Sequence, residues 1–240
     1  MSLFNRAQLF GQLIALPTLL FTLLFSLFYV AGYDFSVAGF YYRLEGGHWA
    51  LQQHWLLQDV LHSGARQLNT LMVMAVLVIC IWRQLTASDQ RRSSCILLLS
   101  LLLSFGLVAL IKKALPAACP WDLQAFGGVQ PFNWLWHSPA PGAVLSQCFP
   151  AGHASAGFGW LALYFYWRDS SAARAKTALF GALLLGTGLG LVQQLRGAHF
   201  ISHDITSAWL CWCCCSFIYA FMADLPGQNA TQSSLREGYV

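Results

Sequence analysis

The sequence has few charged side chains, and this shortage excludes most classes of soluble protein. Charged residues make up 9% of the 240 residues, whereas apolar residues make up 57%. A soluble domain typically carries about 25% charged residues, so this chain lacks the charge to cover a globule with a soluble surface. It is also too apolar to be disordered. The composition indicates a single polytopic membrane domain spanning residues 1–240, with a polar tail at 226–240.

The chain also has no basic stripe, because its 13 basic and 9 acidic residues are spread thinly. A nucleic-acid partner is therefore not expected. Six runs without charged side chains follow one another, and a helix needs roughly 20 mostly apolar residues to cross a membrane. We predict an all-α protein with six transmembrane helices, in the runs bounded by Arg6 and Asp34, Arg66 and Arg83, Arg92 and Lys112, His153 and Arg168, Lys176 and Arg196, and Asp204 and Asp224.

The basic residues predict the orientation of these spans. With a cytoplasmic N-terminus, eight of the basic residues fall on inner segments and five on outer segments. The positive-inside rule favours that arrangement, with both termini cytoplasmic and the two long loops, about 33–66 and 112–153, facing outward. In this topology every histidine lies on the outer side: His48, His54, His62, His137, His153, His199 and His203.

Three separated segments carry the candidate chemistry, and the topology places all of them on the outer face. Lys112 and Lys113 end the third span, residues 149–153 open the fourth, and residues 196–204 join the fifth to the sixth. Together they supply cations, imidazoles, a carboxylate and a helix start at which Gly152 lets the backbone approach an anion closely. Such a set suits phosphoryl transfer, which depends on positioning and on neutralising charge.

Each segment also has a simpler interpretation. A lysine pair at the end of a span can be an interfacial anchor, and a Pro-x-Gly-His stretch can be an ordinary helix start. His199 and His203 are four residues apart on one helix face, so they could bind zinc with Asp204 or Asp122 as a third ligand. No metal site is predicted as the first choice, and zinc remains an alternative.

The motifs resemble those of the type 2 phosphatidic acid phosphatase and haloperoxidase superfamily, in its membrane lipid phosphatase branch. That family reads Lys-x6-Arg-Pro, then Pro-Ser-Gly-His, then Ser-Arg-x5-His-x3-Asp. The resemblance covers about 93–221. The matching positions here are Lys112-x6-Cys119-Pro120, Pro150-Ala151-Gly152-His153, and Gln193-x5-His199-x3-His203.

The resemblance implies a metal-independent lipid phosphatase without a cofactor. His199 would attack phosphorus to form a phosphohistidine, His153 would protonate the leaving oxygen, and Lys112 would bind phosphate oxygens. The implied substrates are phosphatidic acid, phosphatidylglycerol phosphate, a polyprenyl pyrophosphate or the phosphates of lipid A. The implied setting is a bacterial inner membrane, with the site facing the periplasm or exterior. The expected partners are the phosphorylated lipid substrate and membrane lipids, and no protein partner is expected.

Four positions depart from the family pattern, which marks a divergent subgroup. Cys119 and Gln193 replace arginines, Ala151 replaces a serine, and His203 replaces an aspartate. Charged residues that could take over from the missing groups lie nearby, such as Arg196, one helical turn before His199. Either His203 or Asp204 would orient His199, and the role of Asp122 stays open. Phosphate binding is assigned to Lys112, Lys113, Arg196 and Gly152.

Two other functions remain open at this point. A lipid phosphotransferase would pass the phosphoryl group to another lipid, for example lipid A, instead of water. A catalytically inactive relative would bind or transport phosphorylated lipid without releasing phosphate.

The cysteines divide by location. Cys119 and Cys148 are the pair in the outer loops, where an oxidising compartment would permit a disulfide, although both could be free. The cluster Cys211, Cys213, Cys214 and Cys215 is interpreted as small, lipid-facing side chains. In the first outer loop we predict an interfacial helix over a stretch such as 49–61, with Asp59 and His62 as candidates for lining the mouth of the site.

Overall fold

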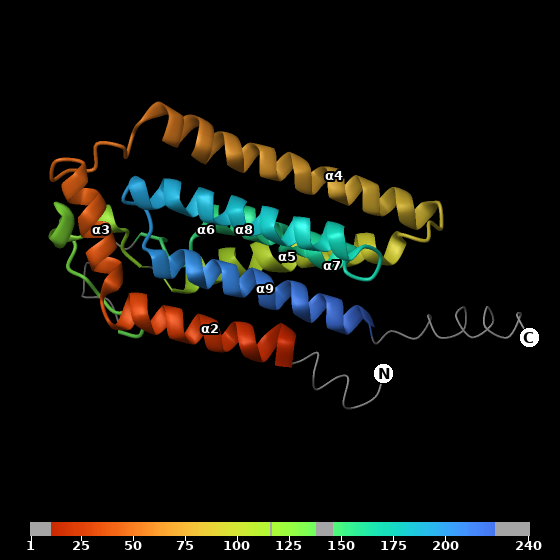
Figure 1. The fold of residues 1–240 in the computed structure, drawn as a ribbon. Coiled ribbons are helices and arrows are strands. Elements are labelled where there is room, and N and C mark those ends of the chain that lie inside the picture. The colour runs from red at the N-terminus through yellow and green to blue at the C-terminus, as the bar shows by residue number, and fades with distance from the viewer. Residues whose placement is uncertain (1–10, 116, 138–145, 224–240) are drawn as a thin grey trace, which may run out of the picture.

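The computed structural model describes residues 11–115, 117–137 and 146–223, and over these ranges it is all-α, without a β-strand. The polar tail predicted at 226–240 lies outside them. Figure 1 shows a bundle of roughly parallel helices with one helix, α3, lying across an end. The helices are α2 (Leu16–Phe25), α3 (Tyr33–Leu44), α4 (Ala65–Leu85), α5 (Arg91–Ala114), α6 (Gly152–Phe158), α7 (Ala162–Trp167), α8 (Ala172–Leu195) and α9 (Ile201–Ala223).

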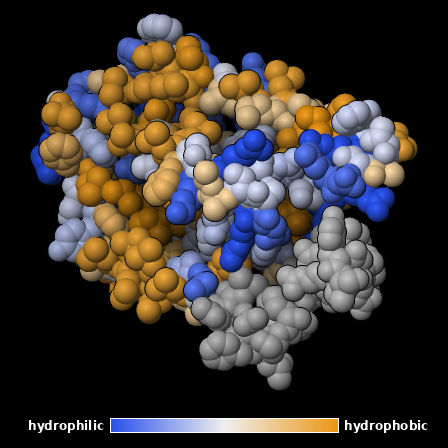
Figure 2. All heavy atoms as spheres, turned by 45° about the vertical axis from the view of Figure 1, so that its right-hand side comes forward, coloured by the Kyte–Doolittle hydropathy of each residue, from blue (hydrophilic) through white to orange (hydrophobic). Residues whose placement is uncertain are grey.

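Five helices are long and apolar enough to cross a membrane, and they coincide with five of the six predicted runs. They are Gly11–Val30, Leu56–Leu85, Arg91–Ala114, Ala172–Leu195 and Ile201–Met222. In the remaining run, α6 and α7 are joined by a 3₁₀ turn at Gly159–Leu161, and neither helix alone has the length of a span. Large apolar side chains are exposed along α2, α4 and α8, and Figure 2 shows broad hydrophobic areas on the outside of the bundle. The fold is that of a membrane protein.

The first loop differs from the prediction. No separate helix covers 49–61: a π-helical turn at Leu56–Gly64 runs straight into α4, because Gly64 keeps helical dihedral angles. The helix of this loop is instead α3, which is separated from the first span by Gly32 at φ 83°. The prediction of an interfacial helix at 49–61 is therefore wrong.

A cluster of aromatic and apolar side chains fixes α3 to the loop that follows α5. Phe126 and Leu123 from that loop, Ala38 from α3, and Phe200 just before α9 are all buried together. The rings of Phe35 and Phe200 stack with centroids 5.5 Å apart. This cluster, which we call the end cluster, anchors the segment immediately before α9 at the end of the bundle where α3 lies.

Small residues let the central helices pack closely. A Cβ on Gly157 of α6 would lie 2.4 Å from the Cα of Gly186 on α8, so the two backbones touch there and no larger residue fits. Cys211 and Cys215 of α9 are fully buried, with the Cys215 Sγ 4.0 Å from the Oγ of Ser104 on α5. Cys214 is buried as well, so the prediction that the cluster faces lipid is wrong for these three cysteines. The small side chains of Cys211 and Cys215 fill the contact between α5 and α9.

Candidate active site

One cavity collects the three predicted segments. It has a volume of about 420 Å³, and Lys112 from the end of α5, His153 from the start of α6, and Arg196 and His199 from the α8–α9 connection line it. The backbone of Gly152 lies beside Lys112, because a Cβ at this position would be 3.6 Å from the Lys112 Nζ. The bundle thus brings two cations and two imidazoles to one concave site.

The position of His199 follows from how α8 ends. The Gly197 N–H donates to the Gln194 carbonyl at 3.0 Å, and the Ala198 N–H donates to the Gln193 carbonyl at 2.8 Å. This is a Schellman motif, which requires a left-handed residue, and Gly197 supplies it with φ 71°. A Cβ on Gly197 would also collide with the Trp49 ring at 2.4 Å. The chain therefore turns sharply after α8 and presents His199 to the cavity.

The start of α6 is fastened to α9, and this places His153 near His199. The Ala151 N–H donates to the His203 carbonyl at 3.2 Å, and the Ser207 hydroxyl donates to the Ala151 carbonyl at 2.9 Å. Ala151 is fully buried in this contact. The alanine that replaces the family serine thus serves as a packed backbone anchor.

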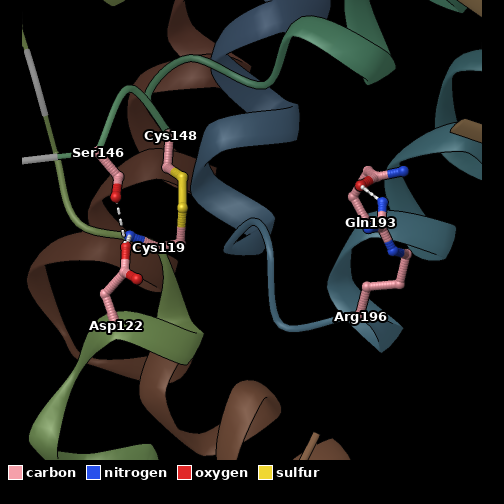
Figure 3. Close-up of a disulfide and its surroundings, with 6 residues drawn as sticks. All are labelled: Cys119, Asp122, Ser146, Cys148, Gln193 and Arg196. Carbon is pink, nitrogen blue, oxygen red and sulfur yellow. Dashed lines mark hydrogen bonds between the residues drawn. A yellow bond between two sulfur atoms is a disulfide. The ribbon is translucent and has the colours of Figure 1, made fainter. Parts of the chain in front are cut away.

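Cys119 and Cys148 form a disulfide with a Cα–Cα distance of 5.3 Å, as Figure 3 shows. Asp122 lies beside it, and its Oδ2 accepts hydrogen bonds from the Cys119 N–H at 3.1 Å and from the Ser146 hydroxyl at 2.6 Å. The bridge and the carboxylate together tie the loop after α5 to the segment that leads into α6. Asp122 is thus a fastening residue of this loop. Across the ranges 11–115, 117–137 and 146–223, no group of three or more potential ligands is placed to hold a metal ion.

Arg196 is held by three glutamines, two of them from the N-terminal part of the chain. Its Nε donates to the Gln52 carbonyl at 3.0 Å, its Nη1 to the Gln193 Oε1 at 2.9 Å, and its Nη2 to the Gln58 Oε1. Its guanidinium carbon also lies 6.0 Å from the centre of the Trp121 ring. The side chain of Arg196 is therefore fixed at the wall of the cavity, and burial lowers its pKa from the ordinary value.

Gln193, at the position of the family arginine, links Arg196 to the site. Its Oε1 accepts from Arg196, and its buried Nε2 has no hydrogen-bond partner within the described part of the chain. Figure 3 shows the two side chains in contact. The pair supplies both a guanidinium and a spare amide donor at the cavity. The sequence shows only that an arginine is missing at this position, so sequence reasoning did not identify Gln193 as a site residue. It did not identify Gln58 either, because no motif includes that residue.

His199 is almost completely buried, with 7% of its surface exposed. Burial, and after it the positive charge of Lys112, lowers the pKa of His199 well below the ordinary value, although a hydrogen bond to the Cys148 carbonyl acts in the opposite direction. The imidazole is therefore neutral near pH 7. A neutral ring keeps the lone pair that a nucleophile needs.

The two residues considered for orienting His199 point in different directions. The His203 ring packs edge-to-face against His199 with centroids 5.7 Å apart. The Asp204 carboxylate instead accepts a hydrogen bond from the Gln194 Nε2 at 2.6 Å and lies against Gly190 of α8. Of the predicted phosphate-binding residues, Lys113 is exposed and does not line the cavity.

His62 is a further residue of this cavity, and it stacks on His153. The two rings lie 3.8 Å apart between centroids with an interplanar angle of 19°. The Nε2 of His153 also lies 3.2 Å from the His62 carbonyl oxygen. The sequence marked His62 only as a candidate for the mouth, since its pairing with His153 joins residues 91 positions apart.

The matched motifs and the cavity agree with the comparison with known families. A family model of the PAP2 superfamily matches residues 93–226, which is more than half of the 240 residues and includes Lys112, His153 and His199. No curated protein sequence and no solved structure gives a significant match. Membership indicates phosphatase-type activity on phosphate esters. The chain belongs to the PAP2 superfamily.

Proposed function

We propose that this protein is a membrane lipid phosphatase that releases phosphate from a lipid phosphomonoester or pyrophosphate through a phosphohistidine at His199. The observation that carries the proposal is the neutral, buried His199 in the same cavity as His153, Lys112 and Arg196. A nucleophile, a proton donor and two cations are the parts that metal-independent phosphoryl transfer requires.

The reaction proceeds in two steps. First, the lone pair of His199 attacks phosphorus, the bond from phosphorus to the leaving oxygen breaks, and that oxygen takes a proton from the imidazolium form of His153. Second, water gives a proton to His153, which restores the imidazolium, and the water oxygen attacks phosphorus. The nitrogen–phosphorus bond breaks, its electron pair returns to His199, and inorganic phosphate is released. Lys112 and Arg196 neutralise charge on the phosphate oxygens in both steps, a role worth more in a buried site than in water.

The lipid nature of the substrate is supported by the setting of the cavity. It lies where Lys112 and His199 stand at the ends of α5 and α9, both of which are apolar enough to span a membrane. A phosphate head group at the membrane surface would reach it while the acyl chains stay among the exposed apolar side chains of the bundle. A soluble phosphate ester has no acyl chain to place among these side chains, so it would gain no binding free energy from them.

We further propose six membrane crossings, with α6 and α7 forming the fourth, and a site on the outer face of a bacterial inner membrane. An even number of crossings agrees with Figure 1, in which α2 begins and α9 ends at the same end of the bundle, opposite α3. The excess of basic residues on the inner segments supports the direction.

The test is phosphate release by the detergent-purified protein. Phosphatidic acid, phosphatidylglycerol phosphate, a polyprenyl pyrophosphate and lipid A are each supplied with a chelator present. We expect release from at least one of them, inhibition by vanadate, and loss of release in His199→Ala but not in His54→Ala, a matched change at an exposed histidine. Release that survives in His199→Ala would refute the mechanism. Transfer of phosphate to a second lipid without release would make the protein a phosphotransferase.

A further inference from the structure

The segment that carries His62 lies outside residues 93–226, which match the family. It nevertheless reaches the cavity, because the π-helical segment Leu56–Gly64 packs against α8. His62 lines the same cavity as Lys112, His153 and His199. Its contact with His153 therefore occurs at the site itself.

The first part of that contact is the backbone carbonyl of His62. A carbonyl oxygen can only accept a hydrogen bond, so the Nε2 of His153, at 3.2 Å from it, carries a proton. In the neutral ring this leaves Nδ1 unprotonated, so Nδ1 is the nitrogen that takes up a proton to form the imidazolium and then gives that proton to the leaving oxygen. In other catalytic sites such a fixed partner selects the tautomer of a histidine and stabilises its imidazolium.

The second part is the ring of His62. A ring held by one hydrogen bond can still rotate about that bond, which would swing Nδ1 away from the substrate. The His62 imidazole lies flat against that of His153, with 3.8 Å between centroids and 19° between planes. This face-to-face packing removes the remaining rotation, and preorganised geometry of this kind is what acid catalysis depends on.

We propose that His62 is the positioning residue of His153, its carbonyl fixing which nitrogen is protonated and its ring fixing the plane in which the other nitrogen meets the leaving oxygen. The inference rests on the proposed function. In the first step the nitrogen–phosphorus bond forms, the phosphorus–oxygen bond breaks, and its electron pair stays on the leaving oxygen. Correct placement of His153 delivers a proton to that pair.

The experiment separates positioning from bulk packing with three variants and two substrates. His62→Ala removes the ring, His62→Phe keeps a flat ring, and His62→Leu fills space without one. All keep the backbone carbonyl. Phosphatidic acid has an alkoxide leaving group that needs a proton, whereas p-nitrophenyl phosphate has a leaving group that departs without one.

We expect His62→Ala and His62→Leu to lower kcat on phosphatidic acid by at least about tenfold with KM within about threefold, as loss of acid catalysis requires. His62→Phe should restore most of that rate. On p-nitrophenyl phosphate all three variants should stay within about threefold of the original protein. Thermal unfolding of each variant checks that it is folded.

Equal losses on both substrates, or equal rates for the Phe and Leu variants on phosphatidic acid, would overturn the proposal. If the original protein hydrolyses only the lipid, the comparison of Phe with Leu decides alone. Failure of the proposed function is a different outcome, because then the original protein releases no phosphate from any lipid before His62 is changed.

Discussion

The carboxylate of Asp34, at the start of α3, accepts a hydrogen bond from the backbone N–H of Ser202 in the first turn of α9, with 3.0 Å between nitrogen and oxygen. This bond spans 168 residues and ends three positions after His199. Asp34 thus caps the helix that follows the candidate nucleophile, as a side chain from another element. Together with the end cluster, it holds α3 against the site.

Asp34 is expected to make stability depend on pH. Burial raises the pKa of Asp34 from 3.8 to about 6, although the hydrogen bonds from Ser202 act in the opposite direction. A raised pKa favours the protonated form in the folded protein, so this contribution is present below about pH 4 and is lost as the pH rises through about 6. The shift corresponds to roughly 3 kcal/mol.

Asp34→Asn tests this dependence, because an amide keeps an oxygen for Ser202 and cannot ionise. Relative to the original protein, the variant should gain thermal stability at pH 7.5 and lose that advantage near pH 4. Unfolding temperatures in detergent at several pH values measure the difference. A difference that does not change with pH would show that Asp34 does not titrate in this range.

Lys112 and Lys113 form a natural matched pair. Lys112 lines the cavity, whereas its neighbour is exposed. A charge-assisted hydrogen bond contributes roughly 1.5–3 kcal/mol, so Lys112→Gln should lower kcat/KM by about 10- to 100-fold. Lys113→Gln should stay within about threefold of the original protein. Similar losses in both variants would mean that the pair serves as a membrane anchor.

His203 and Asp204 are expected to have different roles, His203 in activity and Asp204 in stability. Because the His203 ring faces His199, His203→Gln, which fills much of the volume of this buried side chain, should lower kcat with a small effect on unfolding. Asp204 accepts a hydrogen bond from Gln194, so Asp204→Ala, which removes the acceptor, should retain activity and lower the free energy of unfolding by about 1–3 kcal/mol. Steady-state kinetics and thermal unfolding, measured on both variants, separate the two roles, and the reverse pattern would assign the orienting role to Asp204.

The disulfide is expected to stabilise the loop after α5. Cys119 and Cys148 are separated by 29 residues, and closing a loop of that length contributes about 3–4 kcal/mol in the chain-entropy model. Cys119→Ser, Cys148→Ser and the double variant should therefore be destabilised by the same amount, whereas Cys95→Ser should not share this loss. Peptide mapping without reductant should yield the linked pair, and two free thiols there would contradict the structure.

Much of the bundle could be predicted from local patterns. The uncharged runs locate five long helices because an apolar helix of sufficient length needs no tertiary partner to be recognised. The same patterns fail at 49–61 and at the α9 cysteines. At 49–61 the helix continues into α4 without interruption, and at the cysteines α5 and α9 make a close contact. Both features depend on tertiary packing, which the order of residue types along the chain does not specify.

The sequence by itself was enough to pick out His153, His199 and Lys112 as candidate site residues, because each lies in a short motif whose spacing can be recognised in one chain. Only the tertiary structure decided that Gln193 and Gln58 hold Arg196, that His62 stacks on His153, and that Asp34 caps α9. The physical reason is distance along the chain. With the exception of Gln193, these partners lie many tens of residues from the groups they contact. They come together only because the segment Leu56–Gly64 and α3 pack against residues 93–226, the part of the chain that matches the family.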